Sequence, residues 1–245
     1  MLASKHNRPQ TGSGGMSATV EDYTKAIYAL ESRERRPVST HALAERLEVT
    51  PGSASAMVKR LAEWGLVAHT PYRGVSLTPA GARLALEVLR HHRLLETYLA
   101  EELGMPWDRV HHEAEVLEHV LSEELEELIA AKLGDPARDP HGDPIPNAEL
   151  ELSEDDTVPL ERLEAGAGGV FTRVSDSDPA MLRYLAERGI SPGNRLEVVE
   201  RQPFGGPLHV RFGGAVHALG GTLVAAMRVE PDDPHDRDPG SGVAR

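Results

Sequence analysis

The chain has 245 residues, 40% of them hydrophobic and 27% charged, which suits a soluble globular protein of one to three domains. It contains no cysteine, so disulfides, thiolate zinc sites and thiol nucleophiles are excluded, and any metal must be held by nitrogen and oxygen atoms. No apolar run approaches the roughly 18 residues of a membrane span, and the polar N-terminal stretch lacks the apolar core of a signal peptide. The sequence therefore predicts a cytoplasmic protein without a membrane partner.

The net charge of −13 is unevenly distributed along the chain. Residues 1–100 hold 13 Lys and Arg against 9 Asp and Glu, whereas residues 101–245 hold 13 against 30. The basic-leaning part suits DNA, because phosphate binding rewards clustered cationic side chains. The acidic part suits dimerisation, divalent cations or simply a solvated surface. Function is therefore expected to be divided along the chain.

Composition also divides the chain into domains. Residues 1–17 and 231–245 are rich in Gly, Ser, Pro or Asp and are expected to be disordered, while residues 135–169 carry repeated prolines and acidic residues typical of a linker. The predicted organisation is a DNA-binding domain at 18–78, a helical domain at 79–148, a linker at 149–168 and a β-domain at 169–230.

The first half of the chain has helical periodicity. Apolar residues fall on single stripes in residues 20–32, 39–47 and 53–64, and Ser39 or Thr40 can cap the second of these helices. Two short β-prone runs, 66–69 and 75–78, follow with a turn between them and predict a hairpin. Two long amphipathic helices, from Pro79 to about Leu103 and from Trp107 to about Leu133, come next and can supply a dimer interface.

The second half follows a different pattern. Residues 170–174, 195–199, 208–212 and 222–227 alternate or are β-branched, with glycines between them and one short helix at 179–188. They predict a small β-barrel. The fold class is therefore mainly α with a small all-β domain.

A helix-turn-helix followed by a hairpin is the winged-helix plan, in which the second helix enters the DNA major groove. The start of that helix carries small side chains that suit phosphate bonds and contact with thymine methyl groups, although such residues can also merely cap and pack a helix. The residues expected to contact double-stranded DNA are Thr50, Pro51, Gly52, Ser53, Ser55 and Ala56, with Lys59, Arg60 and Arg73 as phosphate contacts.

Histidines and carboxylates gather on the long helices. A 3.6-residue period places residues 111, 115, 118 and 119 on one stripe, while residues 92 and 96 lie one turn apart on the preceding helix. His and Glu pairs on neighbouring helices are unfavourable to bury unpaired, and a divalent cation is the simplest compensation. A solvated face of mixed charge is the alternative for any one of them. The candidate ligands are Asp22, His92, Glu96, His111, Glu115, Glu118 and His119.

The motifs of metal-dependent hydrolases are missing from this stretch. His112-Glu113 is followed by Val116 where a zinc protease needs a second histidine, and no Gly-x-Ser-x-Gly or phosphate-binding loop occurs. We therefore predict that the chain is not an enzyme. Two rival interpretations remain: a metalloenzyme that carries a helix-turn-helix, and a winged-helix sensor of an organic ligand whose DNA binding ignores chelators.

Several stretches together resemble the diphtheria-toxin-repressor family of metal-dependent bacterial transcription factors, most closely its manganese-responsive branch. These stretches are residues 21–23, 43–47, 58–67, 90–96, 110–119 and 139–146, and the resemblance covers residues 18 to about 228. The resemblance implies a winged helix-turn-helix, a helical metal-binding and dimerisation domain and a C-terminal SH3-like β-barrel. It also implies repression of metal-uptake genes and, together with the long amphipathic helices, a homodimer. The recognition helices of a two-fold dimer meet half-sites one helical turn or a multiple apart, which predicts an inverted-repeat operator, and no small-molecule substrate is expected.

The resemblance assigns roles to the candidate ligands. The primary, activating site would be Asp22, Glu115, Glu118 and His119, and the ancillary site would include His92, Glu96 and His111. The ligands supplied by the third domain would fall on Asp178 and Met181, with Asp176 as a close alternative. A methionine is a poor ligand for a hard cation, so one carboxylate is expected there instead of two side chains.

The choice of metal rests on two positions. In the iron-sensing branch the positions of Asp22 and Glu115 are Met and Cys, whereas carboxylates favour a harder ion such as Mn²⁺. Lys25 stands where two-domain manganese regulators carry a further carboxylate, so a closely spaced metal pair is not expected, and Lys25 can instead neutralise Glu115 or Glu118. The expected cofactor is Mn²⁺, with Fe²⁺ as the alternative and other divalent metals as substitutes in vitro.

Overall fold

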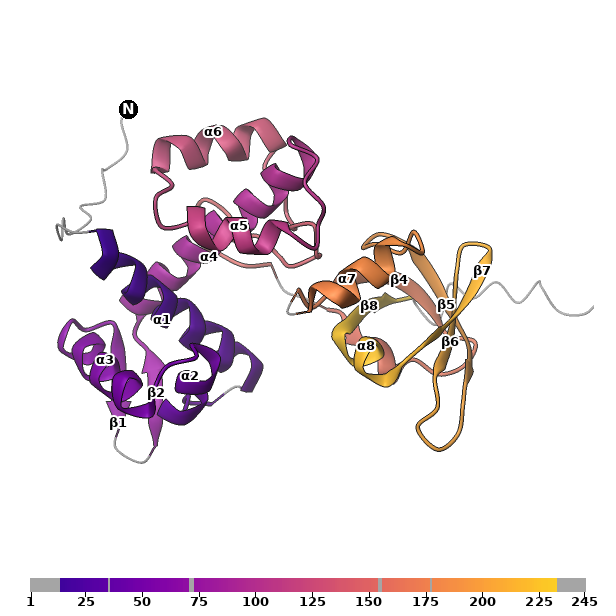
Figure 1. Cartoon of the computed structure of the whole chain (residues 1–245), viewed down its shortest axis with the longest axis horizontal. Coiled ribbons are helices and arrows are strands. Elements are labelled where there is room, and N and C mark those ends of the chain that lie inside the picture. Colours follow the sequence, from indigo (N-terminus) through magenta and orange to yellow (C-terminus); the bar gives the residue numbers. More distant parts are fainter. Residues whose placement is uncertain (1–13, 35, 71–72, 154–155, 177, 233–245) are drawn as a thin grey trace, which may run out of the picture. The chain divides into compact units, whose positions relative to one another are not determined.

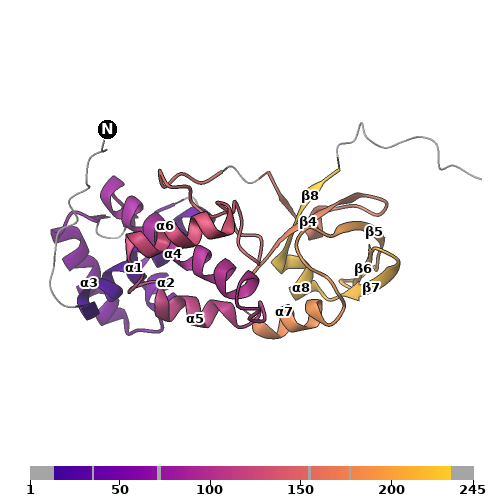
Figure 2. The same cartoon turned by 90° about the horizontal axis from the view of Figure 1, so that it is seen from above.

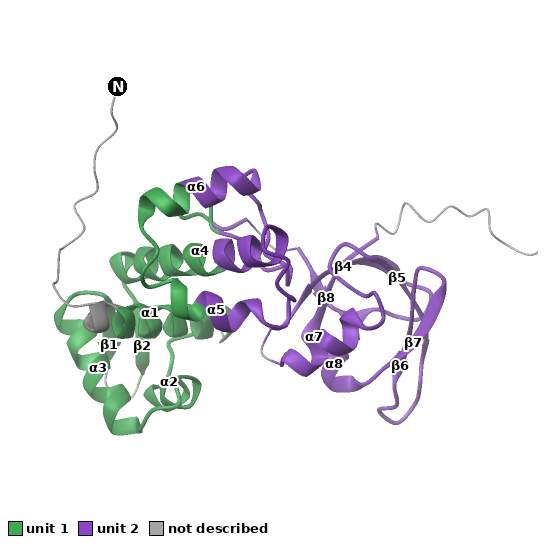
Figure 3. Cartoon of the chain, turned by 45° about the horizontal axis from the view of Figure 1, so that its top comes forward, with its two compact units in different colours: residues 1–92, 115–127, 146–151 green, residues 93–114, 128–145, 152–245 purple. Residues whose placement is uncertain are grey.

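The computed structural model of the chain describes residues 14–34, 36–70, 73–153, 156–176 and 178–232 (Figure 1). The chain forms two compact units (Figure 3). Unit 1 takes in residues 1–92, 115–127 and 146–151, and unit 2 takes in residues 93–114, 128–145 and 152–245. Among the helices of the described residues, none combines the length and the apolar character required to cross a bilayer.

Unit 1 contains the predicted winged helix-turn-helix. Ser39 and Thr50 cap the second and third helices, because their hydroxyl oxygens accept hydrogen bonds from the backbone N–H groups of Ala42 and Ser53. Val67 pairs with Leu77 in the antiparallel hairpin, as expected for the wing. The elements are α1 (Gly14–Glu34), α2 (Thr40–Arg46), α3 (Pro51–Glu63), β1 (Val67–Thr70) and β2 (Gly74–Leu77).

The apolar stripes of these helices form one core. Ile27 of α1, Leu43 of α2 and Leu61 of α3 are fully buried together with Val75 of the wing. The first helix is longer than its apolar stripe, because it begins at Gly14, so the expected disorder of residues 1–17 is wrong for residues 14–17. Residues 1–13 lie outside the described part of the chain, as do Pro71 and Tyr72 in the wing turn.

Three further helices follow the wing: α4 (Pro79–Glu101), α5 (Val110–Leu117) and α6 (Glu123–Leu133). The predicted single helix from residue 107 to 133 is therefore wrong. The chain turns at residues 118–120, and Ser122 starts the next helix by accepting a hydrogen bond from the N–H of Leu125. A turn here separates Glu118 and His119 from the straight stripe that an uninterrupted helix would produce.

The proline-rich stretch after α6 is also more ordered than its composition predicts. Residues 141–146 are buried, and the carboxylate of Asp139 accepts hydrogen bonds from the N–H groups of His141 and Asp143, each at 2.9 Å. The guanidinium of Arg93 donates to the Pro144 carbonyl at 2.5 Å. Side-chain hydrogen bonds thus hold residues 139–143 as a fixed turn, which we call the DPHGD turn after its sequence.

The β-domain of unit 2 is a six-stranded antiparallel sheet in the order β3-β8-β4-β5-β6-β7, counted over the described residues. β4 lies beside β8 in both Figure 1 and Figure 2. The elements are β3 (Val158–Pro159), η1 (Leu160–Arg162), β4 (Gly168–Val174), α7 (Pro179–Ala186), β5 (Arg195–Arg201), β6 (Leu208–Phe212), β7 (Ala215–Leu219), α8 (Gly221–Ala226) and β8 (Met227–Pro231).

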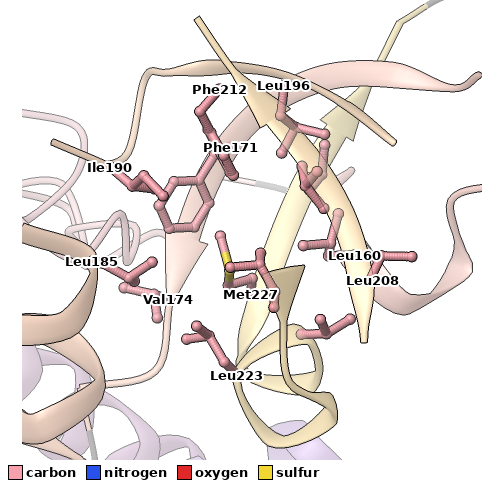
Figure 4. Close-up of a cluster of buried hydrophobic side chains, with 14 of the residues drawn as sticks. Leu160, Phe171, Val174, Leu185, Ile190, Leu196, Leu208, Phe212, Leu223 and Met227 are labelled. Carbon is pink, nitrogen blue, oxygen red and sulfur yellow. The ribbon is translucent and has the colours of Figure 1, made fainter. Parts of the chain in front are cut away.

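Two sequence predictions fail in this domain. Residues 222–227 were expected to form a strand, but α8 occupies residues 221–226 and the strand begins only at Met227. Short buried apolar runs fit a helix and a strand equally well, so the sequence pattern could not separate them. The expected linker at 149–168 contains β3 and η1, and its Leu160 is fully buried in the domain core (Figure 4).

Candidate metal centres and DNA-binding surface

Asp22, Glu118 and His119 converge in unit 1, with one ligand atom from each lying within 4.8 Å of the others. Asp22 comes from α1, while Glu118 and His119 lie in the turn between α5 and α6. The Nε2 atom of His119 is 3.1 Å from Asp22 Oδ1 and 3.6 Å from Glu118 Oε1. Two carboxylates and one imidazole at this spacing are a suitable set for a divalent cation.

The other nitrogen of His119 is also held by a carboxylate. Nδ1 donates to Oε2 of Glu21, which is buried, at 2.7 Å. Asp22 and Glu21 together raise the pKa of His119 to about 10, against a smaller opposing effect of burial. Without a cation the ring is therefore an imidazolium at neutral pH.

Glu118 is engaged on both oxygens. Its Oε1 accepts from Lys25 Nζ and its Oε2 lies against His92 Nδ1, each at 2.5 Å, and its side chain has no exposed surface. Burial by itself would raise the pKa of this carboxyl, but His92 and Lys25 outweigh burial and lower the pKa. Glu118 is consequently an ionised carboxylate inside the protein, which is a strong attraction for a cation.

Glu115 does not join this converging group. Its side chain is 51% exposed, and its Oε1 is 3.6 Å from Lys25 Nζ. Lys25 therefore contacts both Glu115 and Glu118, as the sequence anticipated for a lysine at this position. The described geometry brings together three of the four residues expected at the primary site.

In unit 2, His111 lies between two carboxylates. Its Nδ1 is 3.0 Å from Asp176 Oδ2 and 3.1 Å from Glu96 Oε1. Asp176 and Glu96 raise the pKa of His111 to about 10, in spite of partial burial. Two residues expected in the ancillary site are thus together with a carboxylate of the β-domain. His92, the third expected residue, lies one turn before Glu96 on α4, and its Nδ1 is 2.5 Å from Glu118 Oε2.

The structure corrects which β-domain residues reach this cluster. Asp176 reaches it, whereas Asp178 is the N-cap of α7 and accepts from the N–H of Ala180 at 2.9 Å. Met181 packs against the hydrophobic core of the β-domain. The carboxylate of an N-cap residue accepts a hydrogen bond from the first turn of its helix and so points away from other sites. The ungapped count that assigned Asp178 as a ligand could not detect this capping role.

The sequence analysis missed a further cluster, formed by Glu96, Asp139 and His141. All three side chains are buried, and His141 has no exposed surface. The Nε2–H of His141 donates to the Trp107 carbonyl at 2.8 Å, while Nδ1 faces Glu96 Oε2 at 3.7 Å and has no hydrogen-bond partner among the residues that the structure describes. Burial raises the pKa of Asp139 to about 8, with Glu96 and Asp143 adding to this effect. The Asp-x-His spacing of the DPHGD turn was the signal available in the sequence.

The candidate DNA-binding residues lie at the surface of unit 1. Ala54 and Val58 of α3 face the core, while Ser55 and Ala56 between them are exposed. The guanidinium of Arg60 lies over the Trp64 ring, 5.0 Å from its centroid, which orients that side chain. The exposed candidates are Thr50, Pro51, Gly52, Ser53, Ser55, Ala56, Lys59, Arg60 and, in the wing, Arg73.

Three protein families match consecutive parts of the chain. Residues 15–75 match the iron dependent repressor N-terminal DNA binding domain, and residues 78–147 match the iron dependent repressor metal binding and dimerisation domain. Residues 158–231 match the FeoA domain. The first two descriptions agree with the winged helix and with the clusters of His and carboxylate side chains described above.

Individual proteins agree with these matches. The iron-dependent repressor IdeR of Mycobacterium tuberculosis is 34% identical over 224 residues, which are 86% of this chain and 96% of that protein. The diphtheria toxin repressor of Corynebacterium efficiens is 32% identical over 225 residues, covering 88% and 96% of the two chains. A solved structure described as a manganese-dependent transcriptional repressor in complex with manganese is 45% identical, covers 86% of this chain and 99% of its own, and has a TM-score of 0.81. The chain belongs to the diphtheria-toxin-repressor family of metal-dependent transcriptional repressors, which bind DNA and are not enzymes.

Proposed function

We propose that this chain is a manganese-dependent repressor that binds inverted-repeat operator DNA as a homodimer. The observation that carries the choice of metal is the donor set of the unit 1 cluster: Asp22 and Glu118 supply carboxylate oxygens and His119 supplies an imidazole nitrogen. The chain offers no thiolate, because it has no cysteine. Hard oxygen ligands suit Mn²⁺ better than sulfur ligands do. Fe²⁺ is the competing cation, since iron-dependent repressors are among the relatives.

Asp22 and His119 would hold a bound cation jointly, with Glu118 and with Glu115 after rotation of its exposed side chain. Asp22 comes from α1 of the DNA-binding domain, Glu115 from α5, and Glu118 and His119 from the turn after α5. The cation supplies positive charge that lets the carboxylates approach each other. A cation shared by these segments favours one orientation of α1, and through the common core one placement of α3.

A second cation site is proposed in unit 2. Glu96, Asp139 and His141 offer three buried ligand groups, and Asp176 lies near Glu96 through their common contact with His111. The unpartnered Nδ1 of His141 supports this assignment, because a buried imidazole nitrogen that lacks a hydrogen bond is stabilised by coordination to a metal. The proposed ligands differ from the ancillary ligands expected from the sequence at three positions: Asp139 and His141 are added, and Asp178 is removed.

Dimerisation is supported by exposed apolar side chains in the segment around α5. Val116 is 60% exposed and Val120 is 77% exposed, and Leu125 is 48% exposed. Large exposed apolar side chains are typical of an interface. In a two-fold dimer the recognition helices would meet half-sites about 34 Å apart, or a multiple of that distance, which corresponds to an inverted repeat.

The test is equilibrium anisotropy of labelled DNA against metal-stripped protein, titrated with Mn²⁺ and then, anaerobically, with Fe²⁺. The DNA would be taken upstream of the chain's own gene and of manganese-uptake genes, at one fixed salt concentration. Competitor-resistant binding that requires Mn²⁺ at a lower concentration than Fe²⁺ is expected. Activation by Fe²⁺ at the lower concentration would refute the manganese assignment. Specific binding that ignores chelators would favour the organic-ligand sensor.

Metal binding at the unit 1 cluster is expected to release protons. The pKa of His119 is about 10, so at pH 7 its ring carries a proton that must leave before Nε2 can bind a cation. Apparent Mn²⁺ affinity should therefore rise about tenfold per pH unit between about pH 6.5 and 8.5 for each proton displaced. The stability of the metal-free protein changes with pH in the opposite direction to its Mn²⁺ affinity. Because folding raises the pKa of His119, the protonated ring stabilises the metal-free fold fully below pH 6.5, and this stabilisation is lost as the pH rises through about 10.

Calorimetry in buffers of different ionisation enthalpy measures this proton release directly. At least one proton per bound Mn²⁺ is expected at pH 7, and His119→Gln should lower the count. A count of zero in the unchanged protein would contradict a ligand role for His119.

A further inference from the structure

Two consecutive residues of α1 hold the two nitrogens of one imidazole ring. Glu21 Oε2 lies 2.7 Å from Nδ1 of His119, and Asp22 Oδ1 lies 3.1 Å from Nε2. The two carboxylates differ in exposure, because the Glu21 side chain is 5% exposed and that of Asp22 is 44% exposed. Nδ1 of the ring is therefore held by a buried carboxylate, while Nε2 faces the partly exposed Asp22.

This arrangement determines which ring nitrogen is available to a cation. An ionised carboxylate only accepts hydrogen bonds, so Nδ1 carries the hydrogen in its bond to Glu21. The lone pair of a neutral ring is then on Nε2, which faces Asp22 Oδ1 and, at 3.6 Å, Glu118 Oε1. A buried carboxylate on the far nitrogen also makes the ring a stronger electron donor to a metal.

We propose that Glu21 is a positioning residue of the primary metal site: it fixes the tautomer and orientation of His119 so that Nε2 points at the cation. The proposal rests on the primary site described under Proposed function, and it applies equally to Mn²⁺ and Fe²⁺. It gives α1 a second contribution beside the ligand Asp22, because Glu21 connects the same helix to the same histidine.

An ordinary buried ion pair is the competing explanation for Glu21. Such a pair would stabilise the metal-free protein by holding α1 against His119. It would have no particular effect on the affinity for the cation. If Glu21 positions the ring, replacing Glu21 weakens metal binding even in a variant that keeps its fold. The replacement then also changes the ligand field at the metal. The two explanations therefore differ in metal affinity measured apart from stability.

The experiment compares Glu21→Gln and Glu21→Ala in the full-length, metal-stripped protein. Glu31→Gln is the matched control, because Glu31 is another α1 carboxylate but accepts from the N–H of Leu77 at 3.2 Å, in the wing. Mn²⁺ affinity is measured by electron paramagnetic resonance of the free ion, the ligand field by the visible spectrum of the Co²⁺-loaded protein, and folding by circular dichroism without metal.

We expect Glu21→Gln to weaken Mn²⁺ binding about 10-fold and Glu21→Ala about 100-fold. The Co²⁺ spectrum should shift in both, and Glu31→Gln should bind like the unchanged protein. Gln has the size of Glu but no charge, and its amide can donate as well as accept, so it no longer fixes the hydrogen on Nδ1; Glu21→Gln is therefore informative even if Glu21→Ala fails to fold. Suppose that Glu21→Gln keeps the Mn²⁺ affinity and the Co²⁺ spectrum of the unchanged protein while His119→Gln loses Mn²⁺ affinity. That result would overturn the role of Glu21 and leave the primary site standing. Unchanged affinity in His119→Gln would overturn the primary site and the proposal with it.

Discussion

Asp22→Asn and His119→Gln are expected to abolish metal-dependent DNA binding while leaving a folded protein. Both residues contribute to the converging group of unit 1 and both are partly exposed, and the amide of a glutamine at position 119 keeps an N–H donor for the buried Glu21. Coupling between a metal and DNA is usually about 1–3 kcal/mol, equivalent to roughly 5–150-fold in DNA affinity. That whole gain should disappear in each variant.

Two neighbouring carboxylates sharpen this expectation. Glu115→Gln should lose about tenfold in Mn²⁺ affinity, because Glu115 is proposed as a ligand but now contacts Lys25 and must rotate to reach the cation. Glu113→Gln on the same helix is the control, since Glu113 belongs to none of the convergent groups of described residues, and it should behave as the unchanged protein.

The measurement is DNA anisotropy with and without Mn²⁺, paired with calorimetry of metal binding in the presence and absence of operator DNA. Linkage requires that DNA raise Mn²⁺ affinity by the same factor by which Mn²⁺ raises DNA affinity. A full Mn²⁺ response in Asp22→Asn or His119→Gln would show that the primary site lies elsewhere. Unequal factors would show that binding measured in one of the experiments involves another site.

Gly142→Ala should be among the most destabilising single substitutions in unit 2. Gly142 has a φ of +89° and lies so close to β4 that an added Cβ would overlap the Thr172 carbonyl oxygen and lie 2.8 Å from its carbonyl carbon. The atoms that an added Cβ would meet belong to the backbone of β4, so they cannot move aside as a flexible side chain could. The DPHGD turn is also joined to β4 by a hydrogen bond of 2.9 Å from the Val174 N–H to the His141 carbonyl. The DPHGD turn must therefore separate from the strand to accommodate even one methyl group.

We expect Gly142→Ala to destabilise the protein by about 3 kcal/mol or more, because overlap and an unfavourable φ add. Gly134→Ala is the matched control: Gly134 also has a positive φ, +74°, but an added Cβ would meet nothing within 4 Å. Its effect should be about 1 kcal/mol. Urea unfolding measures both, and equal effects would contradict the close approach of Gly142 to β4.

The same variant tests the second metal site. Displacing the DPHGD turn moves Asp139 and His141 away from Glu96, so Gly142→Ala should retain Mn²⁺ at the unit 1 cluster and lose it in unit 2. Metal content after dialysis against limiting Mn²⁺ distinguishes the two sites. Unchanged metal content in a folded Gly142→Ala protein would argue against the ligand role of Asp139 and His141.

Local patterns in the sequence were sufficient for the elements that local interactions decide. Thr50 and Pro51 start α3, the wing follows it, and the clean 3.6-residue and two-residue periods separate the helical part from the β-domain. The gathering of histidine and glutamate side chains in residues 111–119 was also visible from their spacing, whereas their grouping with Asp22 was implied only by the family resemblance. These features depend on residues within a few turns of one another, where spacing and geometry are tied together.

Only the tertiary structure decided the features that depend on distant partners. The turn at Glu118 breaks the predicted long helix, Asp176 and not Asp178 reaches His111, and the DPHGD turn is buried rather than a linker. Glu21 and His119 are 98 residues apart, and their contact has no counterpart in local spacing. The physical reason is that burial, ion pairing and backbone approach act through space, so a side chain's role depends on what packs against it.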